Sequence, residues 1–204
     1  MYTILGLTIL MTFAQLCENV LPEFSQRVLY ALAQTESNGQ GFVNNRVKIR
    51  FENHIFLSLC PEAKDTFFTG EIPWENHTFL TNGGIKFVHR DQDTEYKALK
   101  LASEICIQAA YKSISVGIFQ IHSSNYQIVG FPEPFPSLFL SFHESDEKAC
   151  YVLKKYLKQQ PELYQAFITE DLDTIAFYWN QNPIWLKRFR EAFENYEVEN
   201  EKTD

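Results

Sequence analysis

The 204-residue chain contains only four cysteines, and none of them belongs to a short metal or redox motif. Cys17, Cys60, Cys106 and Cys150 stand far apart, and no Cys-x-x-Cys pair occurs. This spacing excludes a zinc knuckle and a thioredoxin-like site. A free cysteine behaves as a small hydrophobic side chain, so we expect buried reduced thiols. A disulfide between two of the four stays an alternative, and the sequence does not say which two.

Other catalytic motifs are missing as well. The five histidines include no His-x-x-x-His and no other set with metal-ligand spacing: His54, His77, His89, His122 and His143. We therefore expect neither a catalytic metal nor a cofactor. The chain also lacks a Gly-x-Ser-x-Gly segment and a phosphate-binding loop, which argues against an α/β-hydrolase nucleophile and a P-loop nucleotide site.

Basic charge and long apolar runs are scarce. The 18 Lys and Arg against 26 Asp and Glu give a net charge of -8, so no basic stripe is available to bind nucleic acid. The apolar run from Ile4 to Leu16 is, at 13 residues, too short to span a bilayer. No Lys or Arg precedes it and no cleavage site is obvious, so it is not a convincing signal peptide, although that alternative stays open. We expect no stable membrane insertion.

What is present is the composition of a globular domain. Apolar residues make up 45% of the chain and charged residues 22%, with no internal repeat or low-complexity tract. The length supports one well-filled core and does not favour two full domains. We predict a single domain over residues 1–204, with residues 1–10 as an N-terminal extension and 197–204 as a frayed acidic tail.

Helical periodicity dominates this domain. Helices are expected at residues 12–19, 24–35, 53–59, 94–111, 145–159, 162–168, 171–179 and 183–196. Residues 42–51 alternate around Asn44-Asn45 and predict a small hairpin, whereas residues 62–93 are rich in loop formers. The predicted fold class is α+β, predominantly helical.

The most informative segment follows the helix predicted at 24–35. A run of apolar residues leads to Glu36, and Asn38 and Gly39 are residue types that end a helix in the left-handed conformation. The negative end of the helix dipole and partial burial both disfavour an ionised carboxylate, so we expect the pKa of Glu36 to lie above its usual range. A carboxylic acid protonated near neutral pH suits a glycosidase, which must protonate a leaving-group oxygen. The alternative is a solvated glutamate at a helix end.

Four segments together carry a resemblance to a known family. They are Glu36-Ser37-Asn38-Gly39-Gln40-Gly41-Phe42, Arg50-Phe51-Glu52-Asn53-His54-Ile55-Phe56, the stretch from Ser113 to Ile121 with Asn125-Tyr126 and Gly130-Phe131 after it, and Ile175 to Asn180. In this order they resemble the N-acetylmuramidase domain of phage endolysins and related bacterial proteins, within the lysozyme-like superfamily. Each segment is common by itself, but the resemblance runs from roughly Thr12 to Val198.

Two departures from the family pattern stand out. Val116 occupies the place before Gly117 where the family usually has Trp, and Trp179-Asn180-Gln181 replaces the usual Tyr-Asn-Gly. The first change bears on the shape of a sugar subsite, and the second bears on the loop over the cleft. Neither removes the acid.

The resemblance implies a lysozyme-like fold with a small hairpin or sheet on one lip of a cleft, and it implies roles for particular residues. Glu36 would be the catalytic acid and Glu52 the second carboxylate, although a salt bridge of Glu52 with Arg50 or Arg46 is an equal alternative. Asp91 and Asp93 are weaker acid candidates, and a helix cap suits them better. The implied substrate contacts are Gly117, Gln120, Tyr126, Tyr178, Trp179 and Asn180. For these residues a packed turn or an aromatic core position is the alternative.

The resemblance also implies a partner and leaves rival functions open. The substrate would be peptidoglycan glycan strands, cleaved between N-acetylmuramic acid and N-acetylglucosamine in the periplasm or outside the cell. Without a convincing signal peptide, the chain would stay in the cytoplasm until release or delivery, with a cognate inhibitor or delivery partner if it is a toxin. A lytic transglycosylase or chitinase-like hydrolase, and an inactive glycan-binding domain, remain alternatives. The acidity of the chain does not favour attraction to an anionic wall from outside.

Overall fold

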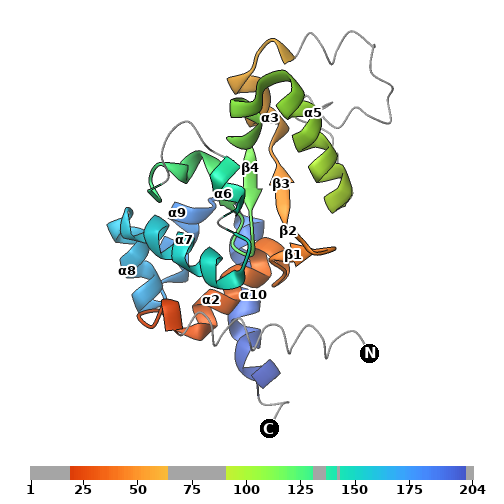
Figure 1. The fold of residues 1–204 in the computed structure, drawn as a ribbon. Helices are drawn as coiled ribbons and strands as arrows, with labels where there is room; N and C mark the ends of the chain where they lie inside the picture. Colours follow the sequence, from red (N-terminus) through yellow and green to blue (C-terminus); the bar gives the residue numbers. More distant parts are fainter. Residues whose placement is uncertain (1–18, 64–90, 131–136, 142, 201–204) are drawn as a thin grey trace. The chain divides into compact units, whose positions relative to one another are not determined.

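The computed structural model describes residues 19–63, 91–130, 137–141 and 143–200 (Figure 1). Residues 12–18 of the helix predicted at 12–19 lie outside the described residues, as do Cys17 and most of the loop-rich segment at 62–93. The helices are α2 (Gln26–Ser37), α3 (Asn53–Leu59), α5 (Gln92–Tyr111), α6 (Ser137–Ser141), α7 (Asp146–Lys158), α8 (Pro161–Thr169), α9 (Leu172–Trp179) and α10 (Pro183–Asn200), with one 3-10 helix, η2 (Ser123–Tyr126). The strands are β1 (Phe42–Val43), β2 (Arg46–Val47), β3 (Ile49–Phe51), β4 (Ile114–Val116) and β5 (Ile121–His122).

This order of elements confirms a mostly helical α+β fold with a small antiparallel sheet. Strands β1 and β2 form a two-stranded sheet, and the second sheet has the order β3-β4-β5. Most helix boundaries lie within two residues of those predicted, and α10 continues four residues further, to Asn200. Among the described residues, no helix is both long and apolar enough to cross a bilayer.

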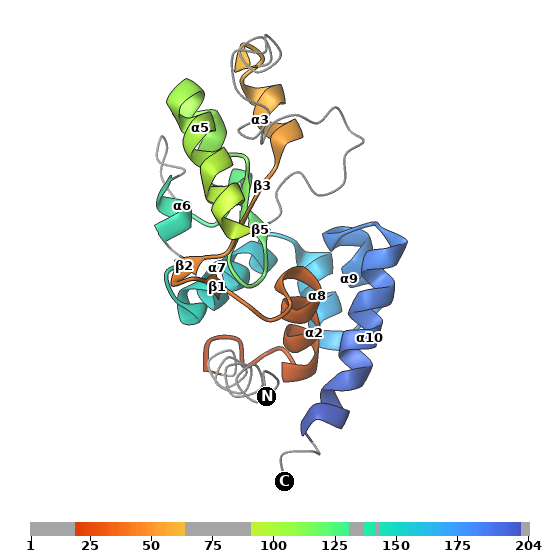
Figure 2. The same cartoon turned by 90° about the vertical axis from the view of Figure 1, so that its right-hand side faces the viewer.

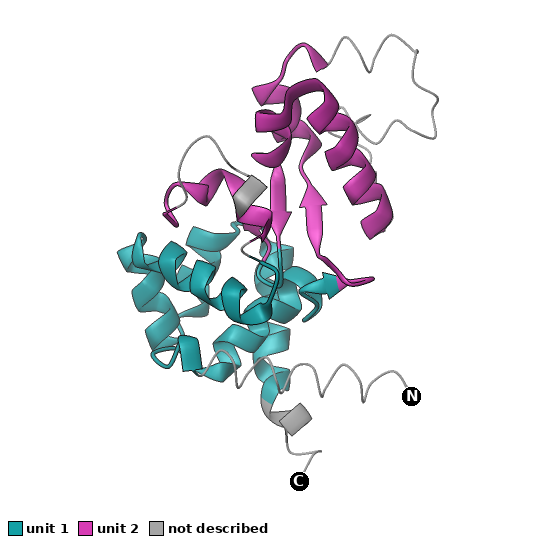
Figure 3. Ribbon diagram, viewed as in Figure 1, with its two compact units in different colours: residues 1–42, 117–119, 142–204 teal, residues 43–116, 120–141 magenta. Residues whose placement is uncertain are grey.

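The chain divides into two compact units (Figure 3). Unit 1 comprises residues 1–42, 117–119 and 142–204, and unit 2 comprises residues 43–116 and 120–141. The prediction of a single domain over the whole chain stays a prediction.

In unit 1, α2 lies beside α10 (Figure 2). One face of α2 is buried as its periodicity predicts, with Val28, Leu29 and Leu32 at most 1% exposed. Arg27 ties the far end of α10 to α2, because its guanidinium lies 4.0 Å from the Phe193 ring centroid and its Nε donates to the Phe193 carbonyl at 2.7 Å. The α2–α10 contact therefore combines apolar burial with a directed polar tie.

Both ends of α2 are set by local chemistry. The Ser25 hydroxyl accepts a hydrogen bond from the Val28 amide at 3.2 Å, which caps the first turn. At the other end, Asn38 and Gly39 have φ values of 55° and 68°, which confirms the predicted left-handed termination. Their amides donate to the carbonyls of Gln34 and Ala33, both at 3.0 Å. These two bonds close the C-terminal end of α2.

The hairpin predicted at residues 42–51 is only partly right. Asn44 and Asn45 do form its turn, with φ values of 53° and 60°, but the hairpin ends with β2. Residues 49–51 form a separate strand, β3, which pairs with β4 so that Ile49 faces Val116 and Phe51 faces Ile114.

Helix α5 explains why β3 leaves the hairpin. The Gln92 side chain accepts from the Ile49 amide at 2.8 Å and donates to its carbonyl at 2.6 Å. The Glu95 carboxylate accepts from the Phe51 amide at 2.6 Å. These two side chains from one helix satisfy backbone groups that a neighbouring strand would otherwise bind, so β3 needs no partner on that edge.

The N-cap of α2 gives a first test. Replacing Ser25 by Ala removes the acceptor for the Val28 amide, so we expect the free energy of unfolding to fall by about 1 kcal/mol. The matched variant Ser25→Asp keeps an acceptor and should stay near the parent in urea denaturation. If Ser25→Ala and Ser25→Asp lowered the free energy of unfolding equally, Ser25 would not stabilise the protein by capping α2.

Candidate active site

Glu36 lies in the last turn of α2 and is half-buried. The residues on either side of it are buried, and their hydroxyls bond within the helix: Thr35 Oγ1 donates to the Ala31 carbonyl at 2.7 Å, and Ser37 Oγ to the Ala33 carbonyl at 2.9 Å. The two neighbours of Glu36 are thus occupied with the backbone of their own helix, and neither of them ionises in the usual pH range. The expectation that it holds its proton near neutral pH stays a prediction.

Two indole groups bind the Glu36 carboxyl. Trp179 Nε1 donates to Glu36 Oε1 at 2.7 Å, and Trp185 Nε1 donates to the same oxygen at 2.8 Å. Both distances are short for N–H···O bonds, as expected of donors to a charged or strongly polar acceptor. The end of α9 and the start of α10 therefore hold the acid of α2.

Aromatic packing fixes each indole. Trp179 meets Tyr156 edge-on with ring centroids 5.6 Å apart, and Phe167 lies tilted against it at 6.2 Å. Trp185 stacks on Phe189 at 4.9 Å and is 6% exposed. Contacts of this kind restrict the rotation of both rings, so the N–H groups point at Glu36 without relying on the carboxyl alone.

The loop between α9 and α10 sets the spacing of the two indoles. The Asn182 amide donates to Asn180 Oδ1 at 3.1 Å, and the Ile184 amide donates to Asn182 Oδ1 at 2.9 Å. Asn180 is thus a structural residue of this turn in addition to being a predicted sugar contact. Tyr178, the neighbouring predicted contact, is 42% exposed and packs edge-on against Phe177.

Gly117 belongs to unit 1 and adopts a φ of 75°. A Cβ at this position would lie 2.6 Å from Cδ2 of His143, which is itself 2% exposed. Both the backbone conformation and the close side chain therefore require glycine here. The departure before it, Val116, is a fully buried member of β4.

A second glycine of unit 1 lies against a carboxylate that the sequence did not single out. An ideal Cβ on Gly41 would stand 2.5 Å from Asp146 Oδ1. Burial raises the pKa of Asp146 above its usual range. Asp146 lies in the first turn of α7, and the sequence analysis made no prediction for it.

Glu52 belongs to unit 2 and has an extensive set of polar partners. Its Oε1 accepts from Arg50 Nε at 2.6 Å and from Ser115 Oγ at 3.4 Å, and it forms an ion pair with Arg50 Nη2. The Glu52 side chain is 15% exposed, against 61% for that of Arg50. The sequence left open a salt bridge of Glu52 with Arg50 or Arg46. The structure contains the bridge with Arg50. Arg46 pairs with Asp93 instead. Asp91 caps α5, as expected.

His122 extends the polar cluster around Glu52. It lies opposite Ser115 in the β4–β5 register, and its Nδ1 accepts from the Ser124 amide at 3.3 Å. The neutral ring therefore carries its proton on Nε2, which is buried and has no hydrogen-bond partner within the described parts of the chain. Burial lowers the pKa of His122, and the Glu52 carboxylate partly opposes this. Sequence reasoning had set this histidine aside because it is not spaced as a metal ligand.

The remaining predicted contacts, Gln120 and Tyr126, lie in unit 2. Gln120 has a φ of 49°, uncommon for a side chain other than glycine, and its Nε2 donates weakly to the Lys48 carbonyl at 3.5 Å. Tyr126 is 2% exposed, with the Lys112 ammonium 5.3 Å from its ring centroid. Burial of this degree disfavours a sugar contact for Tyr126.

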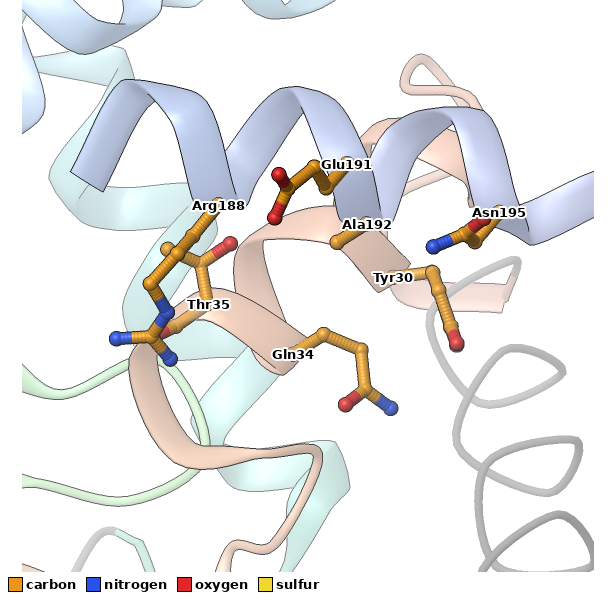
Figure 4. A pocket seen from close by; sticks show the side chains of 7 residues that line it. All are labelled: Tyr30, Gln34, Thr35, Arg188, Glu191, Ala192 and Asn195. Carbon is orange, nitrogen blue, oxygen red and sulfur yellow. The ribbon is translucent and has the colours of Figure 1, made fainter. Parts of the chain in front are cut away.

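A pocket of about 230 Å³ lies between α2 and α10 (Figure 4). It is lined by Tyr30, Gln34, Thr35, Arg188, Glu191, Ala192 and Asn195. Arg188 reaches across it and donates to the Thr35 carbonyl at 2.9 Å. Glu36 is not among the residues that line this pocket, so the pocket is not part of the site proposed around Glu36.

Within the described residues, one cluster has donor atoms close enough to hold a metal ion. Cys60, Glu62 and Cys106 place a sulfur or carboxylate oxygen each within 4.8 Å of one another. Burial, followed by the hydrogen bond with Glu62, raises the pKa of the Cys60 thiol to about 11, which favours the protonated thiol over a metal-binding thiolate. Cys60, Cys106 and Cys150 are free cysteines; Cys60 and Cys150 are buried as expected, whereas Cys106 is only partly buried.

Sequence reasoning missed the second tryptophan, Trp185. As an aromatic residue in the first turn of α10 it had the pattern of a core residue, and it is indeed buried. The available signal was its place six residues after Trp179, across a turn rich in asparagine. Only the fold shows that both indoles meet the same oxygen.

Comparisons with known proteins identify the family and support the fold. The family model for N-acetylmuramidase matches residues 25–197. Among solved structures, the chain is similar to the crystal structure of Burkholderia AP3 phage endolysin, with a TM-score of 0.67 and 20% sequence identity over 92% of this chain and 71% of that one. At this identity the likeness shows the fold. A search of the curated proteins found no match.

The turn at Gly117 gives a second test. Gly117→Ala should lower the free energy of unfolding by roughly 1–3 kcal/mol, because alanine is strained at this φ and its Cβ meets His143. Gly41→Ala is the matched control, since Gly41 has no positive φ and Asp146 can turn away. Urea denaturation of the two variants checks this. A smaller loss for Gly117→Ala than for Gly41→Ala would contradict it.

Proposed function

Because this chain belongs to the N-acetylmuramidase family, we propose that it hydrolyses the β-1,4 bond between N-acetylmuramic acid and N-acetylglucosamine, with Glu36 as the general acid. At the level of the family, it is a peptidoglycan hydrolase, a glycoside hydrolase of the lysozyme type. The observation that carries the finer proposal is the half-buried Glu36 carboxyl at the end of α2, bound by two indole N–H groups.

The environment of Glu36 suits proton donation. Position at the negative end of α2 and partial burial both favour the protonated form. A carboxyl kept protonated can give its proton to the bridging oxygen as the glycosidic bond breaks. The sugar then passes through a transition state that resembles an oxocarbenium ion, and water completes the hydrolysis with assistance from a carboxylate.

Glu52 is our candidate for that second carboxylate. Arg50 forms an ion pair with it, and a carboxylate in this position could stabilise positive charge on the sugar. Its low exposure, 15%, reduces competition from water. The same ion pair also fits a purely structural role, so a test must separate the two.

Sugar contacts are proposed for the exposed residues near the end of α9. Tyr178 and Phe177 expose 42% and 60% of their surface, and aromatic faces of this kind can stack on a pyranose ring. Asn180 is also exposed, although its Oδ1 already accepts from Asn182. Gln120 retains an amide that can both donate to and accept from hydroxyl or N-acetyl groups.

Three rival functions differ from this proposal in their products. A lytic transglycosylase breaks the same bond without water and leaves a 1,6-anhydro ring, so its product is lighter by one water molecule. A chitinase-like hydrolase would act on glycans that lack N-acetylmuramic acid. An inactive glycan-binding domain would yield no product at all.

Glu36→Gln is the direct test of the acid. Because the amide cannot give up a proton, we expect the rate of peptidoglycan cleavage to fall by roughly 10³-fold. Glu191→Gln on α10, an exposed partner of Lys187, is the matched control and should keep the parental rate. Mass spectrometry of the muropeptides reports both the rate and whether the ends are hydrolysed or anhydro. Parental cleavage by Glu36→Gln would remove Glu36 from the proposal.

Glu52 is tested against its ion-pair partner. If Glu52 stabilises the transition state, Glu52→Gln should lower kcat by roughly 10²-fold, whereas Arg50→Gln should have a much smaller effect. If the pair is structural, the two variants should lose stability to a similar extent and kcat should change little in either. Thermal unfolding and kcat measured on both variants separate these outcomes.

A further inference from the structure

Both indole bonds to Glu36 reach a single oxygen. Trp179 and Trp185 donate to Oε1, at 2.7 Å and 2.8 Å. An indole N–H can only donate, so Oε1 must act as an acceptor in both bonds. The two indoles therefore use both acceptor positions of Oε1 before any substrate binds.

We propose that Trp179 and Trp185 are positioning residues, which hold Oε1 of Glu36 as the carbonyl-type oxygen and so place the acidic proton on Oε2. A protonated carboxyl has one hydroxyl oxygen and one carbonyl oxygen, and the carbonyl oxygen has two lone pairs for two donors. A proton on Oε1 would compete with the indoles for those lone pairs. This inference rests on the proposed role of Glu36 and adds which of its atoms donates the proton.

The arrangement also fixes where the donating oxygen points. A carboxyl bound through one oxygen to two immobilised rings cannot rotate without breaking both bonds. Trp179 is packed by Tyr156 and Phe167, and Trp185 is stacked on Phe189. An acid that keeps one orientation loses less entropy when it reaches the geometry for proton transfer.

The same bonds influence how tightly the proton is held. Donors to a carboxylate favour its charged form, so the indoles oppose the helix end and partial burial. Among the described residues, charged groups near this part of α2 include Arg188, bound to the Thr35 carbonyl, and Glu191, which lines the pocket with Thr35. Tyr156 packs on Trp179 from α7, and Asp173 of α9 is paired with Arg190. Phenylalanine at position 179 or 185 leaves all of these in place.

Indole resonances provide a test that does not depend on activity. The chain has three tryptophans, and the third, Trp74, lies outside the described residues. In ¹⁵N-labelled protein, we expect the indole proton resonances of Trp179 and Trp185 to move downfield with one shared midpoint as Glu36 ionises. Trp179→Phe and Trp185→Phe assign the two signals. In Glu36→Gln, whose carbonyl oxygen still accepts both bonds, this shared titration should disappear.

Enzyme kinetics provide the second test. We expect Trp179→Phe and Trp185→Phe to lower kcat several-fold with little change in KM, because the acid loses its fixed orientation. The alkaline limb of the kcat profile should shift to higher pH, because a carboxyl with fewer donors keeps its proton longer. The variant with both substitutions should shift it further. Tyr156→Phe, which alters the packing around Trp179 without removing an indole N–H, should leave the limb in place.

The outcomes separate this inference from the function on which it rests. If Glu36→Gln stays active, the proposed function fails. If Glu36→Gln is inactive but the two indole signals show no shared titration, the function stands and the positioning role is wrong. An unshifted alkaline limb in folded Trp→Phe variants would also overturn it. Should those variants not fold, the titration of the parent and of Glu36→Gln still decides.

Discussion

The bonds from two indoles to one oxygen of Glu36 connect the structural features of unit 1. Helix α2 supplies the carboxyl, and the end of α9 and the start of α10 supply the donors. The bonds form only if α10 packs along α2 and the α9–α10 turn keeps its asparagine caps. The packing of α10 on α2 and the turn between α9 and α10 therefore determine the orientation of the Glu36 carboxyl.

The sequence predicted best those features that depend on local chemistry. The left-handed end of α2 follows from Asn38 and Gly39, because few other residues adopt that conformation at low cost. Helix periodicity and caps located most helices to within two residues. Glu36 could be proposed as an acid for the same reason, since its place at a helix end is visible in a window of about ten residues.

Features that depend on distant contacts were missed. Nothing around Ile49 indicates that Gln92 binds both of its backbone groups, so residues 49–51 were predicted as part of a hairpin. Trp185 and Asp146 were missed for the same reason, since their partners Glu36 and Gly41 are more than a hundred residues away. Side-chain chemistry of this range is decided by packing, and a single sequence does not encode packing in a readable pattern.

The magnitudes explain why a general acid would be built this way. A helix end disfavours an exposed carboxylate by about 0.3–1 kcal/mol, whereas each hydrogen bond to a charged group contributes about 1.5–3 kcal/mol. Two indole donors alone would thus outweigh the dipole and favour a carboxylate that has lost its proton. If Glu36 is the general acid that we propose, its partial burial would have to offset this, because desolvation penalises the charged form. Donors that fix orientation and burial that retains the proton are therefore required together, and a solvent-exposed Glu36 with the same two tryptophans would be well aimed but a poor acid.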